Sequence, residues 1–230
     1  MKVVAIIVAA GSGKRMRHST KKQFLSIGCK PILAYTLDAF DSIDRVDRII
    51  LVIPRGWKRY CQKEIIEKYE YRKEIEVTGG GARRQDSVAC GLALVSSDYE
   101  IVIIHDGVRP FVTRRMVVES IAKARKFGAC VVAVPVTDTI KMVGRDGVIK
   151  RTLPREHLWR VQTPQTFRLS LIKKAYAKAL KDRFYGTDDA QLVERVNRPV
   201  KVVSGDYRNI KITTREDLIL AETLLSGKPF

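Results

Sequence analysis

The chain has 230 residues, 45% of them hydrophobic and 30% charged, a composition typical of a soluble globular protein and not of a disordered one. This length suits one large α/β domain or two small ones. The formal net charge of +18 suggests nucleic-acid binding. The basic residues, however, are spread along the whole chain without an aromatic-rich RNA motif or a basic tail, so we expect no nucleic-acid partner. No apolar run is long enough to cross a membrane, and we expect no membrane partner.

The first predicted element is a strand over residues 2–9, a short apolar, β-branched run of the kind that is buried on both faces of a parallel sheet. It leads into a loop with Gly11 and Gly13, where backbone N–H groups can approach a ligand closely. Positive charge surrounds this turn, from Lys14, Arg15, Lys21 and Lys22. A buried strand followed by such a loop predicts a polyphosphate site. The alternative is a tight strand-to-helix turn with no ligand.

Two familiar phosphate-binding motifs do not fit this loop. The P-loop requires a glycine where Val8 stands and a hydroxyl residue where Arg15 stands, and the dinucleotide fingerprint requires a small residue at Met16. The remaining pattern, Ala9-Ala-Gly-x-Gly-x-Arg-Met followed by Lys22-Gln23-Phe24, is similar to the signature loop of sugar-phosphate nucleotidyltransferases.

Helix and strand patterns then alternate as far as residue 135. We predict helix 31–40, strand 48–53, helix 57–71, strand 74–78, helix 83–94, strand 100–105, helix 113–127 and strand 129–135. This order predicts an α/β fold, a Rossmann-like doubly wound and mostly parallel sheet with helices on both faces. Such sheets bind ligands beyond the carboxyl ends of their strands. The loops 11–22, 79–87 and 106–110 all follow strand ends, and therefore we expect them to form one site.

Residues 137–160 interrupt the alternation. The stretch 137–147 is typical of a strand followed by an Asp-Gly turn, and 148–153 returns as its partner. An inserted hairpin of this kind is either an interaction arm or a flap over the site. The remaining elements are helix 169–181, a helix capped by 187–189, strand 200–204 and helix 215–225. We predict one domain over 1–230, with 137–160 as a β-arm that a homodimer exchanges across a twofold axis.

The cysteines and histidines indicate no metal centre. Cys29, Cys61, Cys90 and Cys130 lack metal-ligand spacing, and His18, His105 and His157 form no ligand cluster. Free thiols are typical of a reducing compartment, so we expect a cytoplasmic protein.

The motifs together resemble one family over nearly the whole chain. They are Ala9-Ala-Gly-x-Gly-x-Arg-Met16, Lys22-Gln-Phe24, Gly80, Arg84-x-Asp-Ser-Val88, His105-Asp-x-x-Arg-Pro110, Pro135-x-x-Asp-Thr-x-Lys141, Thr163-Pro-Gln165, Thr187-Asp188 and Asn209-Ile-Lys-Ile-Thr213. The resemblance is to the 2-C-methyl-D-erythritol 4-phosphate cytidylyltransferase family. Lys21 stands where the family usually has proline, and Gly107-Val108 where it commonly has Ala-Ala. The second difference is nearer to the sister group that makes cytidine diphosphate-ribitol.

The resemblance implies that a methylerythritol phosphate oxygen attacks the α-phosphorus of CTP and that pyrophosphate leaves. The implied catalytic residues are Arg15, Lys22, Arg155 and Lys211. Nucleotide-binding residues would be Ala9, Ala10, Gly11, Gly13, Gly80, Arg84, Asp86, Ser87 and Asp106, and acceptor-binding residues Arg109, Thr139, Arg155 and Lys211. Mg²⁺, or another divalent cation, is expected on the triphosphate with Asp106 in its coordination shell; alternatively, Asp106 binds ribose or caps a turn. Arg155 is expected to reach the partner subunit's site from the arm.

Other functions remain open at this point. Within the enzyme class, the acceptor is alternatively ribitol 5-phosphate, or the nucleotide is UTP. A basic RNA-binding module is the alternative from another class; it would bind nucleic acid with an affinity that falls steeply with salt.

Overall fold

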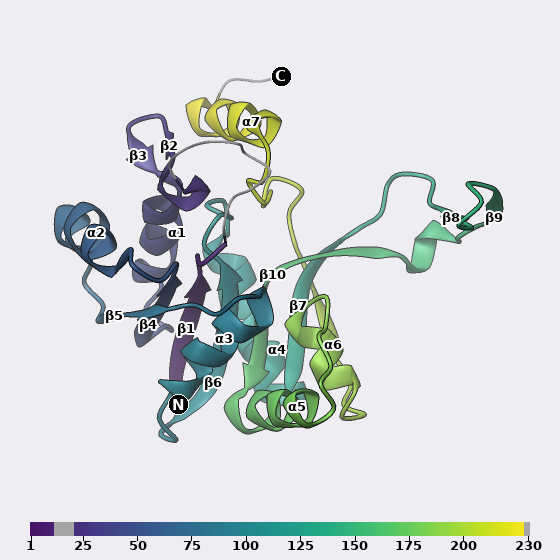
Figure 1. Ribbon diagram of the computed structural model, residues 1–230, viewed down its shortest axis with the longest axis horizontal. Helices are drawn as coiled ribbons and strands as arrows, with labels where there is room; N and C mark the ends of the chain where they lie inside the picture. Colours follow the sequence, from purple (N-terminus) through teal and green to yellow (C-terminus); the bar gives the residue numbers. More distant parts are fainter. Residues whose placement is uncertain (12–20, 228–230) are drawn as a thin grey trace.

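The computed structural model describes residues 1–11 and 21–227. Its centre is a seven-stranded sheet (Figure 1). In spatial order the strands are β11 (Lys201–Ser204), β7 (Ala129–Pro135), β10 (Trp159–Arg168), β6 (Tyr99–Asp106), β1 (Lys2–Val8), β4 (Arg48–Ile53) and β5 (Ile75–Gly79). Every pairing is parallel except those of β10, which is antiparallel to both β6 and β7. The predicted doubly wound, mostly parallel sheet is therefore confirmed.

Helices cover both faces of the sheet. They are α1 (Ile32–Asp41), α2 (Lys58–Cys61) with the π-helical turn η3 (Gln62–Glu67), α3 (Arg84–Ala93), α4 (Arg114–Phe127), α5 (Leu169–Lys181) and α6 (Asp189–Glu194). The last helix, α7 (Arg215–Ser226), packs elsewhere. Alternate residues of β1 supply the two cores: Val3 and Ala5 pack with α1 and α4, while Val4 and Ile6 pack with α3 and α5. Burial on both faces explains why the strand sequences are continuously apolar.

One strand, over 159–168, lies in a stretch to which the sequence analysis assigns no element. Polar residues and Pro164 give this stretch no apolar strand pattern. In the structure β10 is a central strand. The polar side chains within 162–166 are buried but hydrogen-bonded, as with Thr163 and Gln165. Tertiary partners, which the local sequence does not reveal, make this strand possible.

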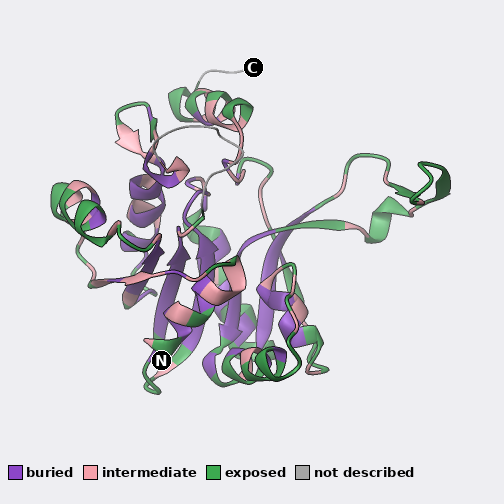
Figure 2. Ribbon diagram, in the orientation of Figure 1, coloured by how far each residue is buried: buried purple, intermediate pink, exposed green. Residues whose placement is uncertain are grey.

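The hairpin is present as β8 (Lys141–Val143) and β9 (Ile149–Thr152), followed by the 3-10 turn η4 (Arg155–His157). It extends away from the sheet and its residues are mostly exposed (Figures 1 and 2). Its apolar side chains Val148 and Ile149 are 55% and 58% exposed. Its role in dimerisation stays a prediction.

A small cluster lies beyond the carboxyl ends of the strands. The pair β2 (Ser26–Ile27) and β3 (Lys30–Pro31) contributes Ile27, which packs with Val108, Ile212 and Ala221 of α7. This packing holds the 206–214 segment beside the end of β6. No helix in the described part of the chain is long and apolar enough to cross a membrane.

Candidate active site

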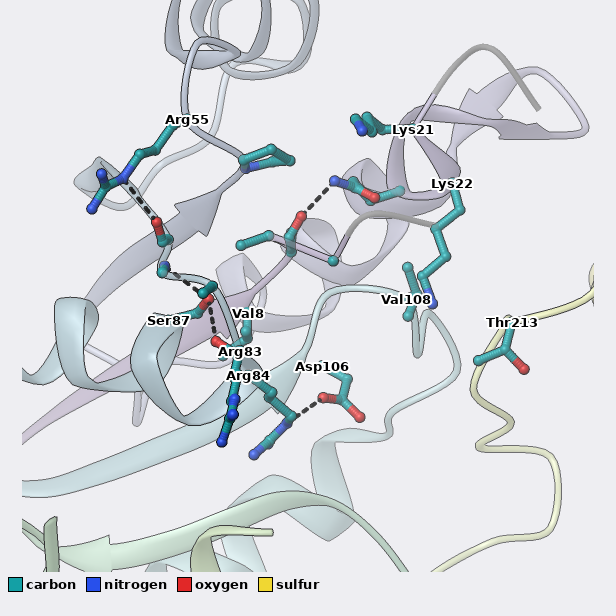
Figure 3. Close-up of a pocket in the computed structure, with 18 of the residues that line it drawn as sticks. Val8, Lys21, Lys22, Arg55, Arg83, Arg84, Ser87, Asp106, Val108 and Thr213 are labelled. Carbon is teal, nitrogen blue, oxygen red and sulfur yellow. Dashed lines mark hydrogen bonds and ion pairs between the residues drawn. The ribbon is translucent and has the colours of Figure 1, made fainter. Parts of the chain in front are cut away.

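A cavity of about 860 Å³ opens at the carboxyl ends of β1, β4 and β6. Nine predicted site residues line it: Ala9, Ala10, Gly11, Lys22, Gly80, Arg84, Ser87, Asp106 and Lys211. In Figure 3, Ser87 and Lys22 lie on opposite sides, with Arg84 and Asp106 between them. The described residues of the three predicted loops therefore meet at one site, as the strand order requires. Gly13 and Arg15 lie outside the described residues.

The glycine-rich wall is packed too tightly for a side chain. A Cβ on Gly80 would lie 2.3 Å from Ala10 Cβ and 2.7 Å from Ser87 Oγ. The Ser87 hydroxyl accepts a hydrogen bond from Gly81 N (3.2 Å) and donates one to Arg83 O (3.0 Å). This wall presents backbone at close range, which suits a ligand with polar edges.

Asp86 lies next to this wall, but its carboxylate caps α3. Arg83 N donates to Asp86 Oδ2 at 3.0 Å, which satisfies an N–H group at the helix start. Asp86 is not among the residues that line the cavity. Its nucleotide-binding role stays a prediction.

Lys22 and Gln23 belong to a short 3-10 turn, η2 (Lys22–Phe24), which is fixed to the first strand. Gln23 is buried, and its Nε2 donates to Ala9 O at 2.5 Å. Lys22 Nζ donates to Ile212 O at 3.4 Å. Phe24 stacks on Trp57 with the ring centroids 5.2 Å apart. These contacts hold the Lys22 ammonium at the mouth of the cavity.

Asp106, at the end of β6, is the centre of a charge cluster. Its Oδ1 is 3.1 Å from Arg84 Nε, and its Oδ2 is 2.9 Å from Lys211 Nζ and 3.5 Å from Arg109 Nε. Burial alone would raise the pKa of Asp106. Its neighbours Arg84, Lys211 and Arg109 outweigh burial and hold the pKa well below the ordinary range. The cavity therefore carries a permanent carboxylate surrounded by an excess of cations, which attracts polyanions.

Arg109 does not line the cavity; it links Asp106 to the Lys211 segment. Its Nη1 donates to Asn209 O at 2.7 Å, and Ile212 N donates to Val108 O at 2.9 Å. Asn209 is fully buried and donates through Nδ2 to Thr163 O at 2.9 Å. Lys211 thus reaches the site from a segment that is anchored to β6 and β10.

His105 is a buried neutral histidine behind Asp106. Burial lowers its pKa to about 3 from 6.5. Thr163 Oγ1 accepts from Asp106 N (3.1 Å), so its proton can be donated to His105 Nδ1 (3.0 Å). The imidazole then carries its hydrogen on Nε2 and donates it to Arg109 O at 3.1 Å. The sequence alone assigned no role to His105, Thr163 or Asn209. The one feature that could have indicated a role is that each is a polar residue at the start of a family motif.

The arm residues lie apart from this cavity. Thr139 and Arg155 are exposed, and Arg155 Nη1 donates to Thr137 O at 2.9 Å within the arm. Neither residue lines the cavity of its own chain. Any role for them in this site requires a second subunit or a large movement of the arm.

The cavity has few groups that suit a resident metal ion. Within residues 1–11 and 21–227, no group of three His, Cys, Asp or Glu side chains is placed to hold one. Both oxygens of Asp106 already contact cations. A divalent ion would therefore need oxygen ligands from elsewhere, such as a polyphosphate.

A doubly wound sheet with a glycine-lined, cationic cavity at its strand ends defines a nucleotide-binding α/β protein of the Rossmann-like class. Within that class, the family model described as 2-C-methyl-D-erythritol 4-phosphate cytidylyltransferase matches residues 3–227. The chain belongs to this family.

Relatives and solved structures agree with this assignment. The 2-C-methyl-D-erythritol 4-phosphate cytidylyltransferase of Caldanaerobacter subterraneus subsp. tengcongensis is 48% identical over 98% of this chain and 99% of its own. That of Geobacter metallireducens is 47% identical over 99% of each chain. The 4-diphosphocytidyl-2C-methyl-D-erythritol synthase structure from Anaerococcus prevotii has a TM-score of 0.88 and 38% identity, covering 98% of this chain and 96% of its own. A Thermus thermophilus cytidylyltransferase structure has a TM-score of 0.80 and 34% identity, with 98% and 100% coverage.

Proposed function

We propose that this protein transfers the cytidylyl group of CTP to 2-C-methyl-D-erythritol 4-phosphate, releasing pyrophosphate. The observation that carries the proposal is the cluster of Lys211, Arg84 and Arg109 around Asp106 at the end of β6, in a cavity whose glycine wall suits a nucleotide. Family membership over 3–227 supports the choice of substrates.

The chemistry requires positioning and charge stabilisation but no covalent intermediate. An oxygen of the acceptor phosphate attacks the α-phosphorus in line, and negative charge grows on the transferring group. Arg15 and Lys22 are proposed to stabilise that charge, Lys22 from η2 at the cavity mouth. Backbone N–H groups at Gly11 and Gly13 are proposed to bind the phosphates.

Cytidine and acceptor are proposed to occupy different sides of the cavity. Ala9, Ala10, Gly80, Arg84, Asp86, Ser87 and Asp106 are assigned to the nucleoside, and Arg109, Thr139, Arg155 and Lys211 to the acceptor phosphate. Ser87 and Lys22 lie on opposite sides of the cavity (Figure 3), and Lys22 contacts Ile212 O next to Lys211, which supports this division. Lys211 would exchange its ion pair with Asp106 for the acceptor's phosphate.

Mg²⁺, or another divalent cation, is proposed to enter with CTP as part of the substrate. The triphosphate supplies the hard oxygen ligands that the cavity lacks. Asp106 is the carboxylate proposed to lie in its coordination shell, directly or through water, since it is the one acidic residue among the described cavity-lining residues. We also propose a cytoplasmic location, since Cys29, Cys61, Cys90 and Cys130 are free thiols.

We further propose a homodimer in which the arm carries Arg155 into the partner's site. The support is the exposed apolar hairpin, which buries little of itself alone and extends away from the sheet (Figure 1). None of the arm residues 137–160 lines the cavity of its own chain. Mixing Lys22→Ala chains with Arg155→Ala chains tests this. If Arg155 acts in trans, each mixed dimer has one intact site, and equal mixing restores roughly a quarter of wild-type activity.

The matched control mixes Lys22→Ala with Lys211→Ala chains. Both residues line the cavity of one chain, so no mixed dimer has an intact site and no activity returns. If Arg155→Ala chains are inactive alone and verified exchange with them restores nothing either, Arg155 acts within its own chain.

The proposed reaction is tested by incubating the protein with Mg²⁺, each nucleoside triphosphate and each acceptor, and measuring pyrophosphate. We expect release with CTP and methylerythritol phosphate. Comparable turnover with ribitol 5-phosphate would contradict the choice of acceptor. Ribitol 5-phosphate is included because Gly107-Val108 differs from the residues common in the family. No release with any pair, together with salt-sensitive RNA binding, would favour the RNA-binding alternative.

A further inference from the structure

Three consecutive residues of the loop between α5 and α6 contact the start of α3. Arg83 lies over the Tyr185 ring, with Cζ 3.7 Å from the centroid. Gln85 Nε2 donates to Phe184 O at 3.0 Å, and Gly186 N donates to Gln85 Oε1 at 2.9 Å. Arg84, between them, contacts the first residue of α6. This loop therefore fixes the position of residues 83–85 at the start of α3, next to the glycine-rich wall of the cavity.

Arg84 is held between two buried carboxylates. Its Nη1 is 2.8 Å from Asp189 Oδ2, and its Nε is 3.1 Å from Asp106 Oδ1. Asp189 is 1% exposed and Asp106 is 5% exposed. Because the guanidinium is planar and contacts at two of its nitrogens fix its plane, the two carboxylates together set its orientation. Figure 3 shows Arg84 directed at Asp106 along one of these contacts.

Asp189 is itself fixed from behind. Tyr176 Oη donates to Asp189 Oδ1 at 2.5 Å, and Asp189 N donates to Gln165 Oε1 at 3.1 Å. Burial, followed by the neighbouring Asp189 charge, raises the pKa of Tyr176, so its hydroxyl remains a donor. Neither Asp189 nor Tyr176 lines the cavity. Each oxygen of Asp189 thus has one partner, Arg84 on the cavity side and Tyr176 on the other.

We propose that Asp189 is a positioning residue for the nucleotide: it orients Arg84, and through Arg84 it sets the place of Asp106. The inference rests on the proposed CTP site, but it concerns binding of the nucleotide alone. A purely structural Asp189 would join α6 to α5 and β10 and would affect the whole fold. A positioning Asp189 affects CTP binding only while Arg84 is present.

A double-mutant cycle on CTP affinity separates these roles. The proteins are wild type, Asp189→Asn, Arg84→Met and the double variant, and the measurement is calorimetric CTP binding without acceptor. Asn keeps the size of Asp189 but removes its charge, and a charge-assisted hydrogen bond is about twice as strong as a neutral one. We expect Asp189→Asn to weaken CTP binding roughly tenfold in the wild-type background. In the Arg84→Met background we expect no further change.

Asp182→Asn is the matched control. Asp182 ends α5 and pairs with Lys178 at 3.0 Å and Arg195 at 2.7 Å, so it joins the same two helices without contacting Arg84. We expect its CTP affinity to equal that of wild type. Equal effects of Asp189→Asn in both backgrounds, or a fall in melting temperature with unchanged CTP affinity, would overturn the inference.

Tyr176→Phe is the second variant and carries the test if Asp189→Asn does not fold. It removes one hydroxyl and leaves the Asp189 carboxylate less firmly held, so we expect roughly threefold weaker CTP binding, again only with Arg84 present. Unchanged affinity would contradict the proposal. If wild type itself binds no CTP, the proposed function fails and the inference falls with it. If wild type binds CTP but the cycle is additive, the inference alone fails.

Discussion

Gly80 offers a sharp test of the cavity wall, because its neighbour Gly79 provides a matched control. A Cβ on Gly80 would lie 2.3 Å from Ala10 Cβ, whereas carbon atoms pack at about 3.5–4.0 Å. The wall would have to open by roughly 1.2 Å, and overpacking of this kind costs about 1–3 kcal/mol. The same Cβ would push Ser87 Oγ away from its partners Gly81 N and Arg83 O.

A Cβ on Gly79 meets far less. Its nearest contact is Arg55 Cγ at 3.2 Å, which belongs to an exposed side chain that can move. We therefore expect Gly79→Ala to change unfolding free energy by less than about 0.5 kcal/mol. Gly80→Ala should lose about 1–3 kcal/mol. A displacement near 1 Å in a site can cost about 10²-fold in rate, so kcat/KM for CTP should fall at least about tenfold.

Urea unfolding, calorimetric CTP binding and pyrophosphate release measure these effects on the two variants in parallel. If Gly80→Ala behaves like Gly79→Ala, Gly80 does not form a close-packed wall. If Gly80→Ala loses stability but keeps CTP affinity and turnover, the wall is structural and the nucleotide lies elsewhere.

Three further outcomes follow from the charged and buried groups. Lys22→Ala should lower kcat by about 10²–10³-fold with a much smaller rise in KM for CTP, and near-normal kcat in steady-state kinetics would remove its transition-state role. Asp106→Asn should cost about 3 kcal/mol in urea unfolding, because it leaves buried cations facing one another; an unchanged midpoint would contradict the charge cluster. The depressed pKa of His105 means that the unfolded chain binds its proton first. The contribution of neutral His105 to the free energy of unfolding is therefore fully present above pH 6.5. It falls by about 1.4 kcal/mol per pH unit as the pH drops towards 3. His105→Gln should show a shallower fall between pH 7 and 5, and equal slopes would mean that His105 titrates normally.

The sheet was predictable because most of its strands have a clear sequence pattern. Stretches such as 48–53 and 129–135 are apolar on both faces, and capped helices separate them. Thr113 caps α4 and Asp188 caps α6 through hydrogen bonds to Met116 N and Gln191 N. Strand ends in parallel sheets meet at one edge, so the meeting of Gly80, Asp106 and the first loop was also predictable.

The buried polar contacts were not predictable, because they depend on partners far apart in the chain. Asp189 contacts Arg84 across more than one hundred residues. Thr163 and Asn209 belong to motifs, yet their sequence surroundings do not say that one hydrogen-bonds the other's backbone. The same dependence hid β10, whose buried polar side chains find their partners in distant segments, as Thr163 does at Asp106 N and Gln165 at Asp189 N.

Direct transfer between the two substrates is the step that this cavity has to perform. The described oxygen nucleophiles that line it are all engaged: Ser87 with Arg83 O, Asp106 with its cations and Thr213 with Asp217 Oδ2 at 2.8 Å. Turnover of CTP bearing sulfur at one stereochemical position of the α-phosphate tests this most directly. A single in-line displacement inverts the configuration at phosphorus, and inversion in the cytidine diphosphate product is the expected result. Retention would show two displacements through a covalent nucleotidyl-enzyme and would contradict direct transfer.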